Sequence, residues 1–229
     1  RPPRSTPLYS SAASDVYKRQ DPTCAMCFWG EALATGPNIN VTNNGKAIMT
    51  PAERADARAA IDQALALMDG VSPKEQDWIR ALDQRYDGHA DTPRDPLDRA
   101  WADALADMAE RYPDDTTVAS VYAEALMNTM PWDYWGPNGE AKPDTQAVIA
   151  SLEAVMEANP DHPLALHLYI HALEASSNAE KEEDAGAGPR WLFRLRTFTT
   201  LDVGGLNIPF FGVGSSEGDS TPGLSLIHI

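Results

Sequence analysis

The strongest constraint on the fold is a helical pattern that repeats through most of the chain. From Asp21 onward, segments of about 12 to 18 residues rich in Ala, Leu, Met and Glu alternate with short clusters of Pro, Gly, Asn and Asp. No segment has the alternating pattern of a strand. We therefore expect an all-α protein of about seven helices, at residues 23–35, 51–69, 73–87, 96–112, 115–130, 145–159 and 163–177.

Three of these helices have clear start signals. Thr50-Pro51, Ser72-Pro73 and Asp95-Pro96 each place an oxygen-bearing N-cap residue before a proline at the first helical position. The helix that begins at Pro51 should bury one face, because apolar residues recur at spacings of three and four. The residues of this face are Ala57, Ile61, Ala64, Leu65 and Met68.

The connections between helices repeat as well. "RYPDD" (residues 111–115) and "ANPDH" (residues 158–162) each end one helix and begin the next within a few residues. Inside hairpins, the first GPN loop, "GPNIN" (residues 36–40), matches the second GPN loop, "GPNGE" (residues 136–140). This alternation predicts a right-handed α-solenoid of antiparallel helix hairpins, with both GPN loops on the same edge.

Charge and length exclude several functional classes. A net charge of -16 repels phosphate backbones and anionic lipids, so we expect neither nucleic acid nor a membrane as partner. No run of about 18 apolar residues occurs, which predicts a soluble protein. The sequence contains no Gly-rich phosphate loop, no Gly-x-Ser-x-Gly motif and no HExxH motif. It therefore gives no support for the common classes of nucleotide-binding proteins and hydrolases.

The two ends differ from the repetitive middle. Residues 1–20 lack a helical period and an apolar signal region, so we expect a disordered, non-native leader. "YSSAASDVYKRQ" in this leader and "LSLIHI" at the other end resemble translated adapter read-through in metagenomic sequences. Residues 184–229 fit no periodic pattern and are expected to be an irregular tail that is not native sequence. The helical-repeat domain then spans residues 21–183.

Several stretches together resemble a known family. "CAMCFWGEALATGPNIN", "RYPDD", "AEALMNTMPWDYW" and "NPDHPLALHLYIHALEAS" are similar to a family of bacterial tetratricopeptide-repeat-like proteins, over about residues 21–183. Residues 29–33, "WGEAL", resemble the Trp and small-residue pattern of the first repeat helix. The resemblance implies a helical-repeat fold and names no activity. The compartment stays open between a bacterial cytoplasm and a periplasm. The family continues into a His-rich segment that this chain lacks.

The chain has two cysteines, Cys24 and Cys27, in a CxxC pattern. This spacing can provide half of a structural zinc site or a redox disulfide, because residues three apart share a helix face. No second CxxC exists, and no strand precedes this one as in thioredoxin-like proteins. We therefore favour two ordinary buried cysteines, since free cysteine is among the most buried residue types.

The predicted helix at residues 163–177 is apolar on nearly every side, and its one polar stripe is formed by His167, His171 and Glu174. His162 precedes Pro163 and fits a cap or loop position. Two histidines four residues apart and a carboxylate can bind zinc or another divalent metal. They can also form a buried hydrogen-bonded cluster without metal, which is the interpretation we favour.

Aromatic residues outside the helices provide another candidate site. The segment at residues 131–135, "PWDYW", precedes the second GPN loop, and such exposed aromatics bind partners in many interfaces. The interpretation we favour is that their side chains fold back to cover the end of the core, since large aromatic residues are usually buried. The candidate binding residues are Asn38, Asn40, Trp132, Tyr134 and Trp135.

Taken together, these patterns favour a helical-repeat scaffold that binds a peptide or protein partner on its concave face and needs no cofactor. A metal-dependent enzyme or metal-binding protein that uses His167, His171 and Glu174 is the alternative. A purely structural array is a third possibility. Whether the chain is an enzyme stays open at this point.

Overall fold

A computed structural model describes residues 21–39, 48–173 and 176, together with the backbone of four short strands. All seven expected helices are present in this part, so the prediction of a mostly helical protein is confirmed. The helices are α2 (Ala25–Thr35), α3 (Pro51–Ala66), α4 (Pro73–Asp83), α5 (Arg94–Arg111), α6 (Thr116–Thr129), α7 (Thr145–Ala158) and α8 (Pro163–Leu173), with a short 3-10 helix, η1 (Met68–Gly70), after α3.

Four short strands lie outside the helices, and the described part is still mostly helical, as predicted. β1 (Thr42–Asn43) pairs antiparallel with β2 (Lys46–Ala47), and β3 (Thr200–Val203) pairs antiparallel with β4 (Leu206–Pro209). In the sequence, Asn44-Gly45 and Gly204-Gly205 separate the two members of each pair. Asn-Gly and Gly-Gly favour two-residue hairpin turns, so these dipeptides could have predicted the two strand pairs.

Two helix starts follow the predicted capping chemistry. The Thr50 and Ser72 side chains accept hydrogen bonds from the backbone N–H groups of Glu53 and Glu75, and each glutamate bonds back to the cap residue. These two capping boxes satisfy N–H groups that have no partner within the helix.

The predicted start of the next helix is displaced. α5 begins at Arg94 after Pro93, so Asp95 is not an N-cap and the expected start at Pro96 is wrong. Arg94 bonds to Asp98 one turn later at 2.7 Å, which favours a helical turn from Arg94 onward. Pro96 still lies in the first turn, where a missing N–H costs no helical hydrogen bond.

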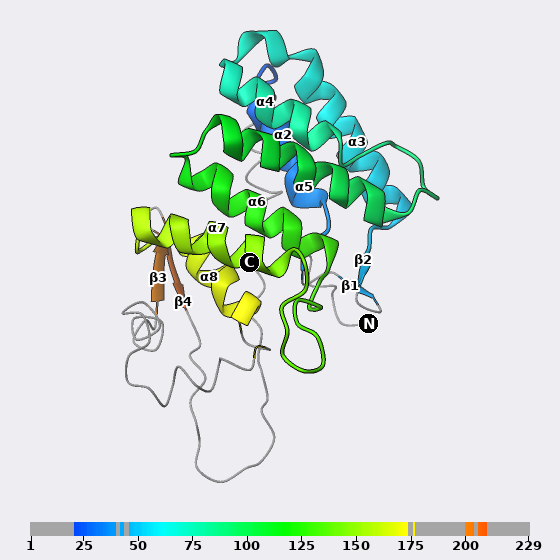
Figure 1. Ribbon diagram of the computed structural model, residues 1–229. Coiled ribbons are helices and arrows are strands. Elements are labelled where there is room, and N and C mark those ends of the chain that lie inside the picture. Colours follow the sequence, from blue (N-terminus) through cyan, green and yellow to red (C-terminus); the bar gives the residue numbers. More distant parts are fainter. Residues whose placement is uncertain are drawn as a thin grey trace.

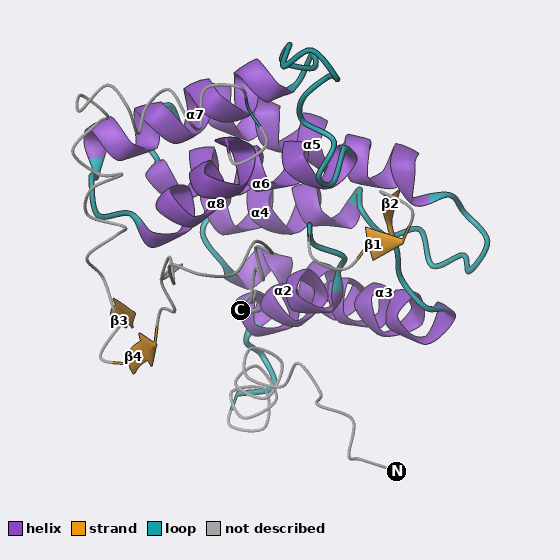
Figure 2. Cartoon of the chain, turned by 90° about the horizontal axis from the view of Figure 1, so that it is seen from below, coloured by secondary structure: helices purple, strands orange, loops and turns teal. Residues whose placement is uncertain are grey.

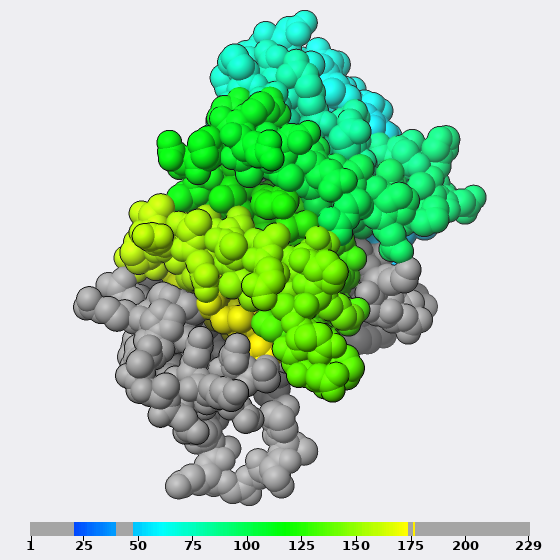
Figure 3. All heavy atoms as spheres, viewed as in Figure 1, coloured from blue at the N-terminus to red at the C-terminus, as the bar shows by residue number. Residues whose placement is uncertain are grey.

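Helices that follow one another in the chain also pack against one another. α2 packs on α3, α5 on α6, α6 on α7 and α7 on α8. Figure 1 shows the order from α3 and α4 at the top through α5 and α6 to α7 and α8 below. Figure 2 shows α2 and α3 side by side along one edge, and the cyan, green and yellow bands of Figure 3 follow the same order on one face.

The core is one continuous cluster of buried side chains from all seven helices. α2 and α3 bury mainly alanines, among them Ala32, Ala57 and Ala64, so their axes can approach closely. Ile61 is buried as the periodicity predicted, whereas Leu65 is half-buried. None of the helices in the described part has both the length and the apolar character that crossing a membrane requires. The predictions for residues 1–20 and for most of residues 184–229 lie outside the described residues.

Candidate functional site

The aromatic segment before the second GPN loop places its three large side chains in different environments. Tyr134 is only 2% exposed and belongs to the core, as the core-covering interpretation expects. Trp135 is half-buried, and its indole N–H donates to the carbonyl of Ala172 over 2.7 Å. Trp132 is 38% exposed, and its backbone has φ +61°, in the left-handed region that bulky residues rarely adopt. Trp132 is therefore the aromatic of this segment that solvent reaches most.

Trp132 connects the first GPN loop with α8. Its indole N–H donates to the carbonyl of Ile39, and its ring packs edge-to-face on His171 with the centroids 5.0 Å apart. Asn38 is half-buried in the same loop, and Asn40 lies outside the described residues. The segment next to the second GPN loop thus lies against the first GPN loop.

The first GPN loop is also held by a buried ionic cluster of Arg85, Asp98 and Arg94, here called the arginine cluster. Arg85 donates to Asp98 over 3.0 Å and to the carbonyl of Pro37 over 2.7 Å. Arg94 donates to the same Asp98 oxygen and, over 3.0 Å, to the carbonyl of Arg85. All three side chains are buried. Buried charges are tolerated when they are paired and hydrogen-bonded, as these are.

α6 presents two further polar groups that the sequence analysis did not single out. Burial raises the pKa of Glu124 above its ordinary value, and the nearby Arg85 charge opposes this shift. Asn128 lies one turn further along α6 and is buried, and its side-chain oxygen has no hydrogen-bond partner in the described part of the chain. Their four-residue spacing within a run of Ala, Leu and Met was the signal for a polar stripe.

The histidine stripe of α8 is only partly described. The rings of His167 and His171 pack edge-to-face with centroids 4.7 Å apart, whereas Glu174 lies outside the described residues. Among the residues that the structure describes, no group of three or more His, Cys, Asp and Glu side chains could hold a metal ion. The described part therefore supplies two of the three proposed ligands side by side.

His162 acts as a cap, as the sequence suggested. Its Nδ1 accepts a hydrogen bond from the backbone N–H of Ala165 over 3.3 Å, at the start of α8. Burial lowers the pKa of His162 below its ordinary value, so the imidazole is neutral and available as an acceptor at neutral pH.

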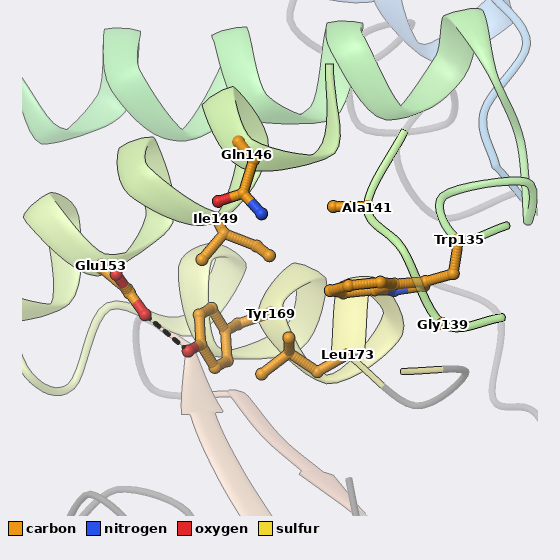
Figure 4. A pocket seen from close by; sticks show the side chains of 8 residues that line it. All are labelled: Trp135, Gly139, Ala141, Gln146, Ile149, Glu153, Tyr169 and Leu173. Atoms are coloured by element: carbon orange, nitrogen blue, oxygen red, sulfur yellow. Dashed lines mark hydrogen bonds between the residues drawn. The ribbon is translucent and has the colours of Figure 1, made fainter. Parts of the chain in front are cut away.

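A pocket of about 490 Å³ opens between α7, α8 and the second GPN loop (Figure 4). Its apolar lining includes Trp135, Ile149 and Leu173, and its polar lining includes Gln146 and Glu153. The Tyr169 hydroxyl donates to a Glu153 carboxylate oxygen over 2.8 Å. The pocket therefore combines an aromatic and aliphatic wall with one carboxylate whose position is fixed, as small binding sites commonly do. The sequence analysis found Trp135 and missed the α7 residues, because their spacing is typical of any amphipathic helix.

The expectation of two free, buried cysteines is wrong. Cys24 and Cys27 form a disulfide, and both residues are half-buried. Cys24 is the N-cap of α2 and Cys27 lies in its first turn, which brings their Cα atoms to 5.3 Å, within bonding range.

No protein-family model, no curated protein and no solved structure matches this chain.

Proposed function

We propose that this chain is a helical-repeat scaffold that binds a peptide or protein partner, and that the pocket beside Trp135 is the centre of the binding surface. The observation that carries the proposal is the pocket itself. It places an indole, two aliphatic side chains and the carboxylate of Glu153 around one cavity. Large aromatic side chains in pockets contribute much of the binding free energy in protein interfaces.

The proposed architecture is a right-handed, tetratricopeptide-repeat-like α-solenoid of antiparallel hairpins. The packing of α5 on α6, α6 on α7 and α7 on α8 supports it, because each element of a solenoid contacts its neighbours in the chain. In this proposal the partner lies on the concave face, with Trp132 and the pocket at one rim.

The charges favour a basic, apolar segment as the partner. The net charge is -16, and the carboxylate at the pocket is Glu153. A bulky apolar side chain would fill the pocket between Trp135 and Leu173, and a neighbouring Lys or Arg would meet Glu153. Complementary charge also accelerates the encounter of two partners.

The test uses a fluorescein-labelled peptide built from repeats of Lys-Leu-Phe-Lys and measures its binding by fluorescence anisotropy. Ile149→Arg should weaken binding by about tenfold or more, because the long charged side chain fills the pocket. Ala150→Arg is the matched control, since it adds the same charge on the exposed neighbouring position of α7. We expect it to change affinity by about twofold at most.

Three outcomes would count against this function. Equal losses of affinity for Ile149→Arg and Ala150→Arg would mean that the peptide binds through the acidic surface charge and not through the pocket. Tighter binding of a control peptide with Glu in place of Lys would contradict the proposed charge of the partner. Absence of binding by both peptides would favour a purely structural array.

Metal binding through α8 is a second candidate function, favoured by the contact between the His167 and His171 rings. In this proposal Glu174 adds the third ligand, and the chain is a metal-binding protein or a metal-dependent enzyme. Calorimetric titration of zinc into the chain and into the His167→Ala, His171→Ala double variant tests it. Stoichiometric binding that the double variant loses would support a metal site, and equal weak binding by both proteins would eliminate it.

A further inference from the structure

The disulfide at the start of α2 is a feature that partner binding does not use. Cys24 and Cys27 are the only cysteines of the chain, so their only thiol partners are each other and external thiols. Both are half-buried, and the preceding residues Asp21, Pro22 and Thr23 are exposed. A small reagent can therefore reach this end of α2.

The disulfide contributes little to holding α2 in place. Only two residues separate the cysteines, and in the chain-entropy account the stabilisation from a disulfide is smallest for the shortest loops. Other contacts dock this helix: the Trp29 indole donates to the carbonyl of Trp78 over 3.0 Å, and the Tyr86 hydroxyl donates to the carbonyl of Ala32 over 2.8 Å. We therefore expect α2 to stay folded when the disulfide is reduced.

The surroundings of Cys24 suit a reactive thiolate. Its sulfur accepts a hydrogen bond from the backbone N–H of Cys27 over 3.2 Å, which is the N-cap role. The first turn of a helix has N–H groups without helical partners, and the helix dipole favours negative charge there. Reactive thiolates of CxxC motifs occur in such positions.

We propose that Cys24 and Cys27 are a redox-active pair that exchanges two electrons with small disulfides and thiols of the glutathione type. In the oxidising direction, the Cys24 thiolate attacks one sulfur of the small disulfide, forms a mixed disulfide and releases one thiolate. The Cys27 thiolate then attacks the Cys24 sulfur, closes the internal disulfide and releases the second thiolate. The pair loses two electrons and two protons, and the small disulfide becomes two thiols.

The first test equilibrates the full chain with buffers of rising ratio of reduced to oxidised glutathione, and counts free thiols by alkylation and mass spectrometry. We expect half-reduction within the series, with the helical circular dichroism signal unchanged to within about a tenth, because other contacts hold α2. A disulfide that stays closed at the most reducing ratio, or that opens only as the helical signal is lost, would show that it is a structural bond and overturn the proposal.

The second test compares two variants with one thiol each. Cys24 in the Cys27→Ser variant should react about tenfold or more faster with an aromatic disulfide reagent than Cys27 in the Cys24→Ser variant, because Cys24 occupies the N-cap. Equal rates would contradict the assignment of Cys24 as the attacking group. In a further step, zinc alone is added to the reduced chain. Stoichiometric protection of both thiols from alkylation would show that the pair is a metal site and would overturn the redox proposal. Neither test depends on peptide binding.

Discussion

The two GPN loops begin with the same three residues and have different structural roles. In the first, Pro37 and Ile39 are buried, and their carbonyls accept hydrogen bonds from Arg85 and Trp132. The second closes on itself, because the Gly136 N–H donates to the carbonyl of Glu140 over 2.8 Å. Its Gly139 has φ +79°, and this loop borders the pocket.

The difference shows that distant partners decide the role of a loop. Arg85 is 48 residues from Pro37 in the sequence, and Trp132 is 93 residues from Ile39. Both partners cover the first loop, so it contributes to the fold. The second loop forms its backbone hydrogen bond within itself and remains accessible beside the pocket. The first loop therefore contributes to stability, and in the proposed function the second loop borders the binding surface.

The largest loss of stability is expected when the arginine cluster, which holds the first loop, loses its carboxylate. Asp98→Ala leaves the buried charges of Arg85 and Arg94 without their carboxylate and should lower the free energy of unfolding by about 3 to 5 kcal/mol. Urea unfolding measures it. Asp103→Ala is the control, because its side chain is 68% exposed and should cost about 0.5 kcal/mol at most. Similar losses for both variants would show that the cluster does not stabilise the fold.

The next prediction compares the two loops directly. A Cβ atom at Gly36 would lie 2.3 Å from the Tyr86 hydroxyl and 2.9 Å from an Arg85 nitrogen, so Gly36→Ala should destabilise the fold by about 1 to 3 kcal/mol. At Gly136 the three atoms nearest to a Cβ all belong to the flexible carboxylate of Glu140, and Gly136→Ala should change stability by about 0.5 kcal/mol or less. Thermal unfolding of both variants measures the difference, and a larger loss at Gly136 would reverse the assignment.

A substitution at Trp135 tests whether the pocket beside the second loop binds the peptide. Trp135→Phe keeps an aromatic ring and removes the indole N–H that donates to Ala172, so it should cost about 1 kcal/mol of stability. It should also weaken binding of the Lys-Leu-Phe-Lys peptide, because it changes the pocket wall. The same substitution at Trp29, whose indole donates to Trp78, is the control: it should cost similar stability and leave peptide affinity unchanged.

The smallest effect is expected from Glu124, beside the arginine cluster. Burial raises the pKa of Glu124 in the folded state above its ordinary value. Protonated Glu124 therefore adds to the stability of the fold below the ordinary pKa, and this stabilisation is lost as pH rises through the folded-state pKa. Glu124→Gln should therefore raise the melting temperature at pH 7 by on the order of 1 °C, with no difference below about pH 4. A fall at pH 7 would mean that attraction to Arg85 outweighs the cost of burial.

The sequence predicted the helices well because their signals are local. The N-caps Thr50 and Ser72 and the spacing of apolar residues mark boundaries without reference to the rest of the chain. The start of α5 was misplaced because the pairing of Arg94 with Asp98, which extends that helix, depends on the surrounding core.

The candidate site was predictable only in part. Trp132 and Trp135 stand out in the sequence, but their different environments depend on contacts with Ile39 and Ala172. Glu153 and Tyr169 come from different helices, and no spacing rule predicts that they meet. Such sites arise from tertiary packing, which a helical pattern does not specify.

The most direct test of the division between the two loops is photo-crosslinking of the bound peptide. A Lys-Leu-Phe-Lys repeat peptide with a photoreactive group in place of one Phe is bound to the full chain and irradiated, and the attachment sites are mapped by mass spectrometry. We predict crosslinks to Trp135, Ala141 and Leu173 around the pocket. Crosslinks concentrated at Asn38 and Ile39 in the first loop would contradict the account.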